Sequence, residues 1–541
     1  METERIYARQ HRGVVVAQNG VVAASQPLAA TAGLQVLMRG GSCVDAAIAT
    51  SAVLCVVEPY NSQIGGDGFA IVFDGKEERT TAFNGSGAAP RQATRERFAS
   101  GIPVRGLAAA SVPGLVSLWF TLHERWGTLP VAELLQPAID YARQGFPAGY
   151  RYVRAFETHA GWLKEFADTQ ATLTGGAPLH PGAVIRQPDL GWTLEQIALG
   201  GREAFYRGPV MERVMAFSRE SGGLFAPEDW AEHRTQVCDP LRVTYRGYTV
   251  HGQPPVSQGH ILLQELNLVE GFNLAEMGPG SADTIHVQVE AKKLAFADRA
   301  AYLGDPDFVQ VPVSALLSKE YAARRREQID LRHAAVNVQA GEVPHDTTYF
   351  CVADRWGNAV SFIQSVFWGF GCGVIAKGTG VLFNNRMTGF SLDPSSPNVL
   401  APGKRTAHTL NACVVTHGTG ERGALAFLGG TPGGDVQVQS NLQVICNVID
   451  FGMNAQEAVE APRWQHGGAV GAAGELAGGV LGVETRVAER TLQELERRGH
   501  VVERLDPWGH GSAYQLIIRH PESGAYLAGS DPRCDGQAVG F

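Results

Sequence analysis

The stretch that constrains this chain most is TTYFCVADRWGNAVSFIQS, residues 347–365. It holds two strand-like runs, TTYFCVAD and AVSFIQS, which flank an Arg-Trp-Gly-Asn turn. Almost every position in both runs is apolar, whereas a strand with one face in water alternates apolar and polar residues. The pair must therefore be covered on both faces, which predicts a strand pair inside a layered protein.

Strand and helix patterns surround this pair. The segment 14–25, VVVAQNGVVAAS, predicts a β-hairpin that turns at Asn19-Gly20. Residues 27–41 and 45–59 predict two helices, the second apolar nearly all round and therefore buried. Amphipathic helical patterns fill roughly 110–345, and strands return afterwards, including GVLFNN, NACVVTHG and ALAFLGG. Strands near both ends with helices inserted between them predict one α/β body, with two sheets sandwiched between helices.

Composition excludes several classes of protein. The chain has 541 residues, of which 44% are hydrophobic, so it can bury a large core. Its net charge is −9 and it has no cluster of five or more basic residues, which argues against a nucleic-acid partner. The longest apolar runs, such as AAIATSAVLCVV, are shorter than a membrane span, and the charged N-terminus lacks the apolar stretch of a signal peptide. We expect neither a nucleic-acid nor a membrane partner.

The eight cysteines are scattered singly and form no C-x-x-C pair, which disfavours zinc sites and disulfide frameworks. Most sit among apolar residues, as buried free thiols do in a reducing compartment. This pattern predicts a cytoplasmic protein.

Other motifs carry little weight. GTGERG at 418–423 matches G-x-G-x-x-G, but it joins two strands and no helix follows, so a hairpin turn is the better interpretation. H-E-x-x-H, G-x-S-x-G and Walker A sequences are absent, and the 16 histidines show no metal-ligand spacing. We expect no metal and no organic cofactor.

Thr347 and Thr348 stand at the start of the first apolar strand. A threonine is β-branched and favours strands for that reason alone. A threonine hydroxyl is also a weak nucleophile unless a base lies beside it, and an N-terminal threonine carries its own α-amine as that base. Such an amine titrates near pH 8 (about 7.7–8.0), close to a useful working pH. An internal threonine becomes N-terminal only if the preceding peptide bond is cut.

Many separated motifs, in order, give this chain a resemblance to the γ-glutamyltransferase (γ-glutamyltranspeptidase, glutathione hydrolase) family of N-terminal-nucleophile hydrolases. The segment DTTYFCVADRWGNAVS, from Asp346, is similar to the processing site of that family. Eight further motifs match along the chain: GGSCVDAAIA (40–49), QIGGDGFAIVFDG (63–75), YRGYTVHGQPPVSQGH (245–260), ADRAAYLGDPDF (297–308), GFGCGV (369–374), TGVLFNN (379–385), APGKR (401–405) and GTPGGD (430–435). The match extends from about residue 13 to the C-terminal GSDPRCDGQAVG.

The resemblance implies a four-layer αββα sandwich and a self-processing precursor. Cleavage between Asp346 and Thr347 would leave a large subunit, residues 1–346, and a small catalytic subunit, residues 347–541. The two would stay associated as a heterodimer that forms one interleaved globular domain. The implied activity is cleavage of a small-molecule amide through an acyl-threonine intermediate, with γ-glutamyl compounds such as glutathione as the family default.

The resemblance also assigns catalytic residues. Thr347 is the nucleophile, and Ser365 matches a second hydroxyl that hydrogen-bonds it, although a polar residue on a buried strand needs a partner in any case. Gly433 and Gly434 match the paired glycines whose backbone N–H groups form an oxyanion hole. The alternative for TPGGD is a simple turn.

The chain departs from the family pattern where the substrate head group would bind. Ser86 stands where the family has the arginine that holds an α-carboxylate, and Arg386 stands at the glutamine position. His408-Thr409 replace a pair of serines. In addition, Thr388-Gly389 replace the acidic pair that binds an α-ammonium, and Phe367 replaces an asparagine.

These departures remove the acid that would compensate an α-ammonium. We therefore hypothesise an amide with an anionic or neutral acyl part and no α-amino group, as in oxamate amidohydrolases or acylases for glutaryl-type side chains. Ser86, Arg386, His408 and Thr409 are the candidate substrate-binding residues, and a surface or structural role is the alternative for Arg386. A non-catalytic relative that keeps the scaffold is the rival from another class.

Overall fold

The computed structural model describes residues 10–335, 346–467 and 479–541. Two seven-stranded antiparallel sheets form its frame. The first sheet has the order β1 (Val15–Ala17), β20 (Tyr526–Ser530), β19 (Gln515–Arg519), β15 (Leu425–Gly430), β14 (Cys413–His417), β9 (Tyr248–Gly252) and β8 (Leu241–Tyr245). The second has the order β21 (Gln537–Gly540), β2 (Gly20–Ala24), β10 (Asp346–Asp354), β11 (Ala359–Phe367), β3 (Asp67–Asp74), β4 (Arg79–Gly85) and β7 (Gln236–Cys238).

The two sheets pack face to face over a shared apolar core. Along β10, Tyr349 and Cys351 point into the core between the sheets, where they meet Leu428 and Ile517 of the first sheet. Alternate residues such as Phe350 point away from it, into the core beneath the outer helices. This two-sided burial follows from the period of two in a strand, and it confirms that both faces of the β10–β11 pair are covered.

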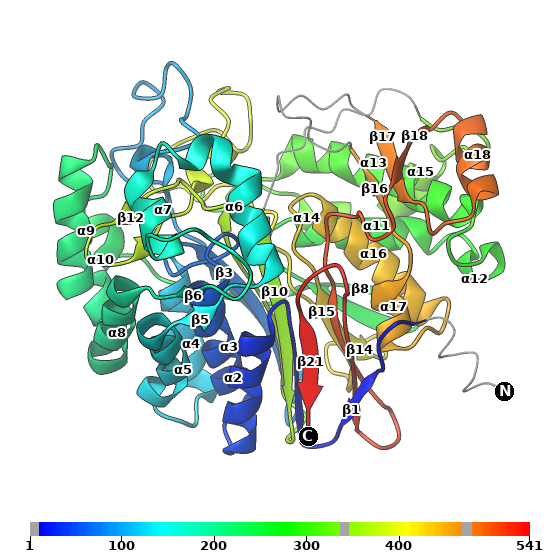
Figure 1. The fold of residues 1–541 in the computed structure, drawn as a ribbon. Helices are drawn as coiled ribbons and strands as arrows, with labels where there is room; N and C mark the ends of the chain where they lie inside the picture. The colour runs from blue at the N-terminus through cyan, green and yellow to red at the C-terminus, as the bar shows by residue number, and fades with distance from the viewer. Residues whose placement is uncertain (1–9, 336–345, 468–478) are drawn as a thin grey trace.

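Helices cover the outer face of each sheet, as Figure 1 shows. The second sheet is covered by α2 (Pro27–Met38), α3 (Cys43–Val57), α4 (Leu115–Trp126), α5 (Val131–Gln144) and α8 (Pro188–Tyr206). The first is covered by α11 (Gly259–Val269), α13 (Ala282–Tyr302), α16 (Val436–Ile449) and α17 (Ala455–Glu460). The fold is therefore the expected αββα sandwich. Among the described residues, none of the helices combines the length and apolarity that crossing a membrane would need.

The remaining elements decorate this frame. The helical ones are η1 (Leu107–Ala109), α6 (Tyr150–Leu163), α7 (Ala167–Thr174), α9 (Pro209–Glu220), α10 (Pro227–Ala231), α12 (Leu274–Met277), α14 (Val313–Leu316), α15 (Lys319–Arg326), η2 (Arg386–Gly389) and α18 (Glu489–Arg497). The strands are β5 (Phe146–Pro147), β6 (Val184–Ile185), β12 (Ile375–Ala376), β13 (Val381–Leu382), β16 (Trp464–His466), β17 (Val480–Glu484) and β18 (Val501–Leu505).

The prediction of an N-terminal hairpin is wrong. β1 pairs with β20 in the first sheet, whereas β2 pairs with β10 and β21 in the second, so Asn19-Gly20 passes from one sheet to the other. An Asn-Gly pair favours a tight turn locally, but pairing of β2 on both edges outweighs that preference. The GTGERG segment does join β14 and β15 as a hairpin, as expected.

The frame places the start of β10 in the middle of the second sheet. β10 lies between β2 and β11, and β11 lies between β10 and β3. The strands that come from residues before 346 therefore flank the two strands that follow it. The two-chain division at 346/347 stays a prediction, and a cut there would leave two interleaved chains.

Candidate active site around Thr347

Thr347 is the second residue of β10 and is nearly fully buried. The β10–β11 register is irregular at this point, since Asp346 pairs with Phe367 but Thr348 pairs with Gln364. Such a bulge re-aims one side chain out of the regular ladder. Asp346 is described only as the first residue of the strand, and His345 before it lies outside the described residues. The irregularity therefore falls on the predicted nucleophile.

Ser365 holds the Thr347 hydroxyl. Thr347 Oγ1 donates to Ser365 Oγ at 3.3 Å, and the backbone N–H of Phe367 donates to the same oxygen at 2.7 Å. Phe367 has a φ of 85°, a rare backbone conformation for a residue with a side chain. The two hydroxyls are together as predicted, and the catalytic role of each stays a prediction.

Gly433 and Gly434 form the turn between β15 and α16. Their φ values are +118° and +56°, which glycine adopts readily. Gly433 O accepts from Val436 N at 2.9 Å, and Gly434 O accepts from Gln437 N at 3.1 Å. The pair thus stands at the N-terminus of a 14-residue helix, where the helix dipole favours negative charge.

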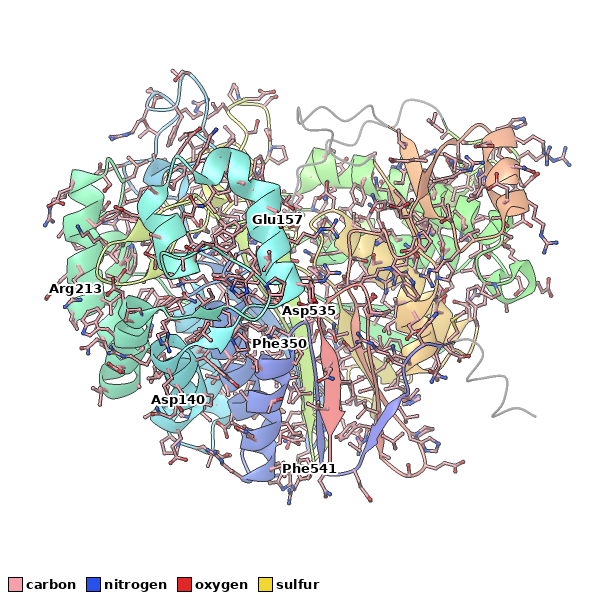
Figure 2. The ribbon with its side chains drawn as sticks, viewed as in Figure 1. Asp140, Glu157, Arg213, Phe350, Asp535 and Phe541 are labelled. Carbon is pink, nitrogen blue, oxygen red and sulfur yellow. The ribbon has the colours of Figure 1, made fainter. Side chains whose placement is uncertain are left out.

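Thr347 and Gly433 line one cavity of about 530 Å³. Helix α6 contributes one face to this cavity, at i, i+3, i+4, i+7 and i+8: Arg151, Arg154, Ala155, Thr158 and His159. Figure 2 labels Glu157 on α6 and shows Asp535 near the base of that helix. Arg151 Nε lies 3.8 Å from Asp535 Oδ1. The cavity is therefore polar, and it opens beneath a helix with two exposed arginines.

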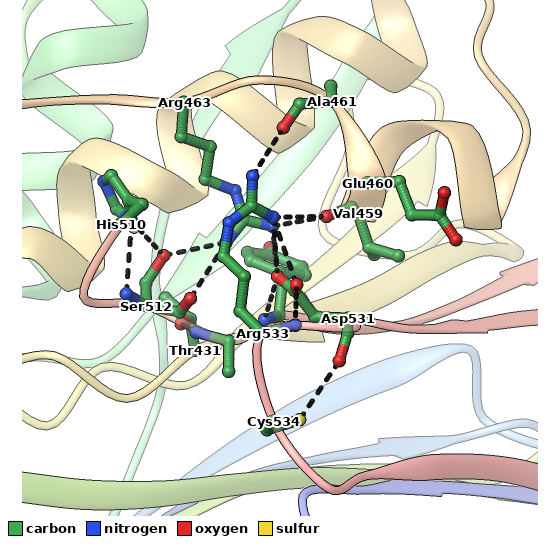
Figure 3. A network of polar contacts seen from close by, with 12 residues as sticks. Thr431, Val459, Glu460, Ala461, Arg463, His510, Ser512, Asp531, Arg533 and Cys534 are labelled. Atoms are coloured by element: carbon green, nitrogen blue, oxygen red, sulfur yellow. Dashed lines mark hydrogen bonds and ion pairs between the residues drawn. The ribbon is translucent and has the colours of Figure 1, made fainter. Parts of the chain in front are cut away.

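A buried ion-pair network supports the opposite wall, residues 506–513 (Figure 3). Arg533 pairs with Glu484 at 2.7 Å and with Asp531 at 3.0 Å, and Arg463 pairs with Asp531 at 2.7 Å. Arg463 also donates to Ser512 Oγ at 2.8 Å. Burial alone would raise the pKa of Glu484, but Arg533 outweighs it and holds that pKa at about 2.

This wall is joined to the glycine turn. The backbone N–H of Ala513 donates to Thr431 Oγ1 at 2.9 Å, two residues before Gly433. Ser512 Oγ and Ser440 Oγ, the latter on α16, are 3.0 Å apart. The loop, the turn and the helix thus form one hydrogen-bonded unit.

A second polar cluster lies on the other side of Ser365. Asp67 is opposite Ser365 in the β3–β11 register, and its Oδ2 accepts from Arg386 Nε at 3.1 Å. The guanidinium of Arg386 stacks on the Phe367 ring, with 4.1 Å from Cζ to the ring centroid. Arg386 is fully buried, and its Nη1 and Nη2 have no hydrogen-bond partner among the described residues. Burial lowers the pKa of Arg386 to about 10 despite Asp67, so it keeps its charge at neutral pH.

The other candidate substrate residues are placed as follows. His408 lies with its Nε2 3.7 Å from Asp67 Oδ2, and Thr409 follows it, with a buried Oγ1 that has no partner among the described residues. Ser86 donates to Asn84 Oδ1 at 2.6 Å, so its hydroxyl is already engaged. None of these residues, nor Arg386, lines the cavity beside Thr347. Arg386 and His408 thus share Asp67, apart from the open cavity.

Two residues beside the nucleophile, Ser25 and Glu58, are not among those predicted from the sequence. Ser25, the residue directly after β2, hydrogen-bonds Thr348 Oγ1 at 2.6 Å and donates to Glu58 Oε2 at 2.9 Å. Both Ser25 and Glu58 line the cavity with Thr347. Burial raises the pKa of Glu58, although the hydrogen bonds from Thr348 and Ser25 oppose this. A glutamate directly after the wholly buried helix α3 was the only signal in the sequence.

The histidines also form one group that their spacing along the chain does not predict. His286 and Glu290 are one turn apart on α13, and His500 brings a third side chain close enough for a metal. The three are engaged with protein groups, however, since His286 Nδ1 is 2.8 Å from His500 Nε2 and Glu290 pairs with Lys293 at 2.7 Å. The arrangement is a hydrogen-bonded cluster, and the absence of a metal stays a prediction.

Comparisons with known proteins agree with this geometry. The gamma-glutamyltranspeptidase family model matches residues 29–541. A glutathione hydrolase-like YwrD proenzyme of Bacillus subtilis is 38% identical over 532 residues, which cover 97% of this chain and 99% of that protein. An oxamate amidohydrolase proenzyme of Klebsiella pneumoniae is 35% identical over 544 residues, which cover 97% and 99%. A crystal structure of cephalosporin acylase from Bacillus halodurans superposes with a TM-score of 0.89 at 38% identity, covering 98% of this chain and 97% of that one.

Proposed function

The chain belongs to the gamma-glutamyltranspeptidase family, and we propose that it is a self-processing amidohydrolase with Thr347 as its N-terminal nucleophile. Hydrolysis of the Asp346–Thr347 peptide bond would leave a carboxylate on residue 346 and a free α-amine on Thr347. The products, of 346 and 195 residues, would remain together as a heterodimer because β2 and β3 of the first pair with β10 and β11 of the second.

The free α-amine of Thr347 is the general base of the proposed reaction. It takes the proton of the Thr347 hydroxyl, whose oxygen attacks the amide carbon of the substrate. The backbone N–H groups of the Gly433-Gly434 turn and the N-terminus of α16 stabilise the oxyanion. The C–N bond then breaks, and the amine leaves with the proton. Water releases the acyl group from Thr347, or an amine accepts it.

The substrate class rests on one observation, the two unpartnered nitrogens of buried Arg386. Arg386 stacks on the ring of Phe367. The backbone N–H of Phe367 donates to Ser365 Oγ, and the Thr347 hydroxyl donates to the same oxygen. A guanidinium fork binds a carboxylate through two parallel hydrogen bonds, and a buried cation without such partners is costly. We therefore propose that the acyl part of the substrate carries a carboxylate that pairs with Arg386.

The same cluster disfavours an α-ammonium on the acyl part. Asp67 is the acid of this cluster, and it already accepts from Arg386 Nε at 3.1 Å and from Gly87 N at 3.0 Å. The acyl group best suited to the site is thus a dicarboxylic half, of the oxalyl or glutaryl type. Relatives named oxamate amidohydrolase and cephalosporin acylase support this choice.

Three matched anilides test the proposal. Glutaryl, γ-glutamyl and butyryl p-nitroanilides differ only in the distal carboxylate and the α-ammonium. We expect kcat/KM to be at least 10-fold higher for the glutaryl than for the γ-glutamyl compound. That ratio corresponds to a difference of about 1.4 kcal/mol in activation free energy. Arg386→Met should abolish this preference and leave the butyryl rate within about 3-fold. Oxamate is assayed in parallel by ammonia release.

A preference for the γ-glutamyl anilide and for glutathione would instead support glutathione hydrolysis, the family default. An uncut band near 57.9 kDa with no turnover of any amide would favour a non-catalytic scaffold. A cytoplasmic location is part of the proposal, because all eight cysteines are free and most are buried.

A further inference from the structure

Two sequence motifs with no role so far converge on the residue after the glycine turn. YRGYTVHGQPPVSQGH contributes Gln258, and ADRAAYLGDPDF contributes Arg299 on α13. Arg299 binds Asp435 in a bidentate ion pair, with Nη1–Oδ1 at 2.5 Å and Nη2–Oδ2 at 2.8 Å. Its Nη1 also donates to Gln258 Oε1 at 2.7 Å.

Gln258 links Arg299 to the glycine pair by hydrogen bonds. Its Nε2 donates to Gly434 O at 3.1 Å and to Thr409 O at 2.8 Å. The Gln258 side chain is fully buried, and the side chains of Arg299 and Asp435 are only 16% and 6% exposed. The Arg299 guanidinium is fixed further by the Phe296 ring, 4.1 Å from Cζ. A chain of short contacts thus runs from α13 to the glycine turn.

The role of Asp435 is unusual for its position. It is the N-cap residue of α16, where an aspartate ordinarily accepts a hydrogen bond from the second or third helical N–H. Here its side chain makes no such cap, because both carboxylate oxygens bind Arg299. The carbonyls of Gly433 and Gly434 accept from the first helical N–H groups instead. The aspartate therefore anchors the turn to α13.

These contacts fix the direction of backbone donors. A peptide unit is planar, so holding the Gly434 carbonyl also orients the N–H of Asp435, and holding the Gly433 carbonyl orients the N–H of Gly434. Glycines have no side chain to hold them in place and adopt many backbone conformations. An oxyanion hole, by contrast, requires donors that are aimed before the reaction begins.

We propose that Arg299 and Gln258 are positioning residues that orient the Gly433-Gly434 turn for oxyanion stabilisation, through Asp435 and through the Gly434 carbonyl. This inference rests on the proposed function of the turn. Neither Arg299 nor Gln258 lines the cavity beside Thr347. Both act through the turn and not on the substrate, so their loss affects the transition state more than substrate binding.

The test uses the processed enzyme and two variants of different chemistry. Gln258→Leu removes the donor to Gly434 without leaving a buried charge, and Arg299→Met removes the anchor of Asp435. We expect kcat on the best anilide to fall about 10- to 100-fold in each, below the 10²–10³-fold loss for deleting an oxyanion donor outright, while KM stays within about 3-fold. Arg299→Lys, which keeps one contact to Asp435, should recover part of kcat.

Asp298→Asn is the matched control. Asp298 is the neighbour of Arg299 on α13, and it pairs with Arg325 at 3.0 Å in a comparably buried setting. We expect wild-type kcat from it. An equal loss in Asp298→Asn, or a rise in KM with kcat unchanged in Gln258→Leu, would overturn the proposal.

A crystal structure of Gln258→Leu gives an answer that does not depend on turnover. A displaced Gly433–Gly434 peptide, which carries the Gly434 N–H, supports the positioning role, and an unmoved one overturns it. Failure of the proposed function has a different signature, namely a processed wild-type enzyme that cleaves no amide.

Discussion

The hydroxyl oxygens of Thr347 and Ser365 are 3.3 Å apart on neighbouring strands of the second sheet, with Thr347 as the donor. The contact forms where the β10–β11 register shifts, so the irregular strand and the hydroxyl pair are parts of one feature. Ser365 Oγ is itself fixed by the backbone N–H of Phe367. Ser365 therefore accepts the hydrogen bond of the Thr347 hydroxyl from a fixed position.

Removing the Ser365 hydroxyl should slow catalysis without preventing folding. A hydrogen bond of this kind contributes about 0.5–1.5 kcal/mol, so we expect Ser365→Ala to lower kcat about 2- to 10-fold. Ser365→Thr keeps a hydroxyl and should retain most activity. Ser361 lies on the same strand, bonded to the Tyr349 hydroxyl at 2.7 Å, and Ser361→Ala is the control. Equal kcat losses at both serines would contradict the role of Ser365.

Thr347→Ala should abolish both cleavage and turnover, because we propose that the Thr347 hydroxyl oxygen attacks the preceding peptide bond during processing and the substrate amide afterwards. The wild-type protein should give two bands, the smaller of which has 195 residues and begins Thr-Thr-Tyr-Phe. The variant should show one mass near 57.9 kDa. Intact mass under denaturing conditions and N-terminal sequencing make the measurement. Cleavage that survives in Thr347→Ala would remove this residue as the nucleophile.

The sequence predicted the central layers because their signal is local. The β10–β11 pair is apolar on both faces, so other elements must pack on both sides of it. The structure shows this for Tyr349, in the core between the sheets, and for Phe350, in the core beneath the outer helices. The prediction of an N-terminal hairpin is wrong because it used a local turn signal, whereas the pairing of β1 depends on a strand far away in the sequence. β1 finds its partner in β20, some 500 residues later, and no turn motif encodes that choice.

Only those residues of the site that lie in a recognisable sequence motif could be predicted. The resemblance predicts the Thr347–Ser365 pair, whereas for Arg386 the sequence allows a substrate-binding, a structural or a surface role. Its full burial makes the surface alternative wrong. The contact of Ser25 with Thr348 and the Arg299–Asp435 pair join residues 323 and 136 positions apart. Such pairings arise from the packing of the two sheets and their helices, so spacing along the chain does not reveal them.

Gly433→Ala should lose activity by a backbone mechanism. Its φ of +118° is a conformation that residues with a Cβ rarely adopt, at a cost of about 1–3 kcal/mol. An added Cβ would also lie 3.3 Å from Gly511 O, in the cavity wall. We expect kcat to fall about 10²-fold or more as the donor turns away from the oxyanion. Gly418→Ala, with a φ of +83° and open space around it, should cost stability but not kcat.

Stability should fall in acid through the Glu484–Arg533 pair behind the cavity wall. The folded-state pKa of Glu484 is about 2, below its unfolded value near 4.5. A depressed pKa stabilises the fold above the unfolded pKa, and this stabilisation is lost as pH falls from about 4.5 towards 2. The full contribution is about 3 kcal/mol for a shift of this size.

Denaturant unfolding at several pH values between 5 and 3 measures this contribution. In Glu484→Gln, the slope of unfolding free energy against pH should be shallower by up to about 1.4 kcal/mol per pH unit. Glu157→Gln, an exposed change on α6, should keep the wild-type slope. An unchanged slope in Glu484→Gln would mean that the network does not hold Glu484 ionised.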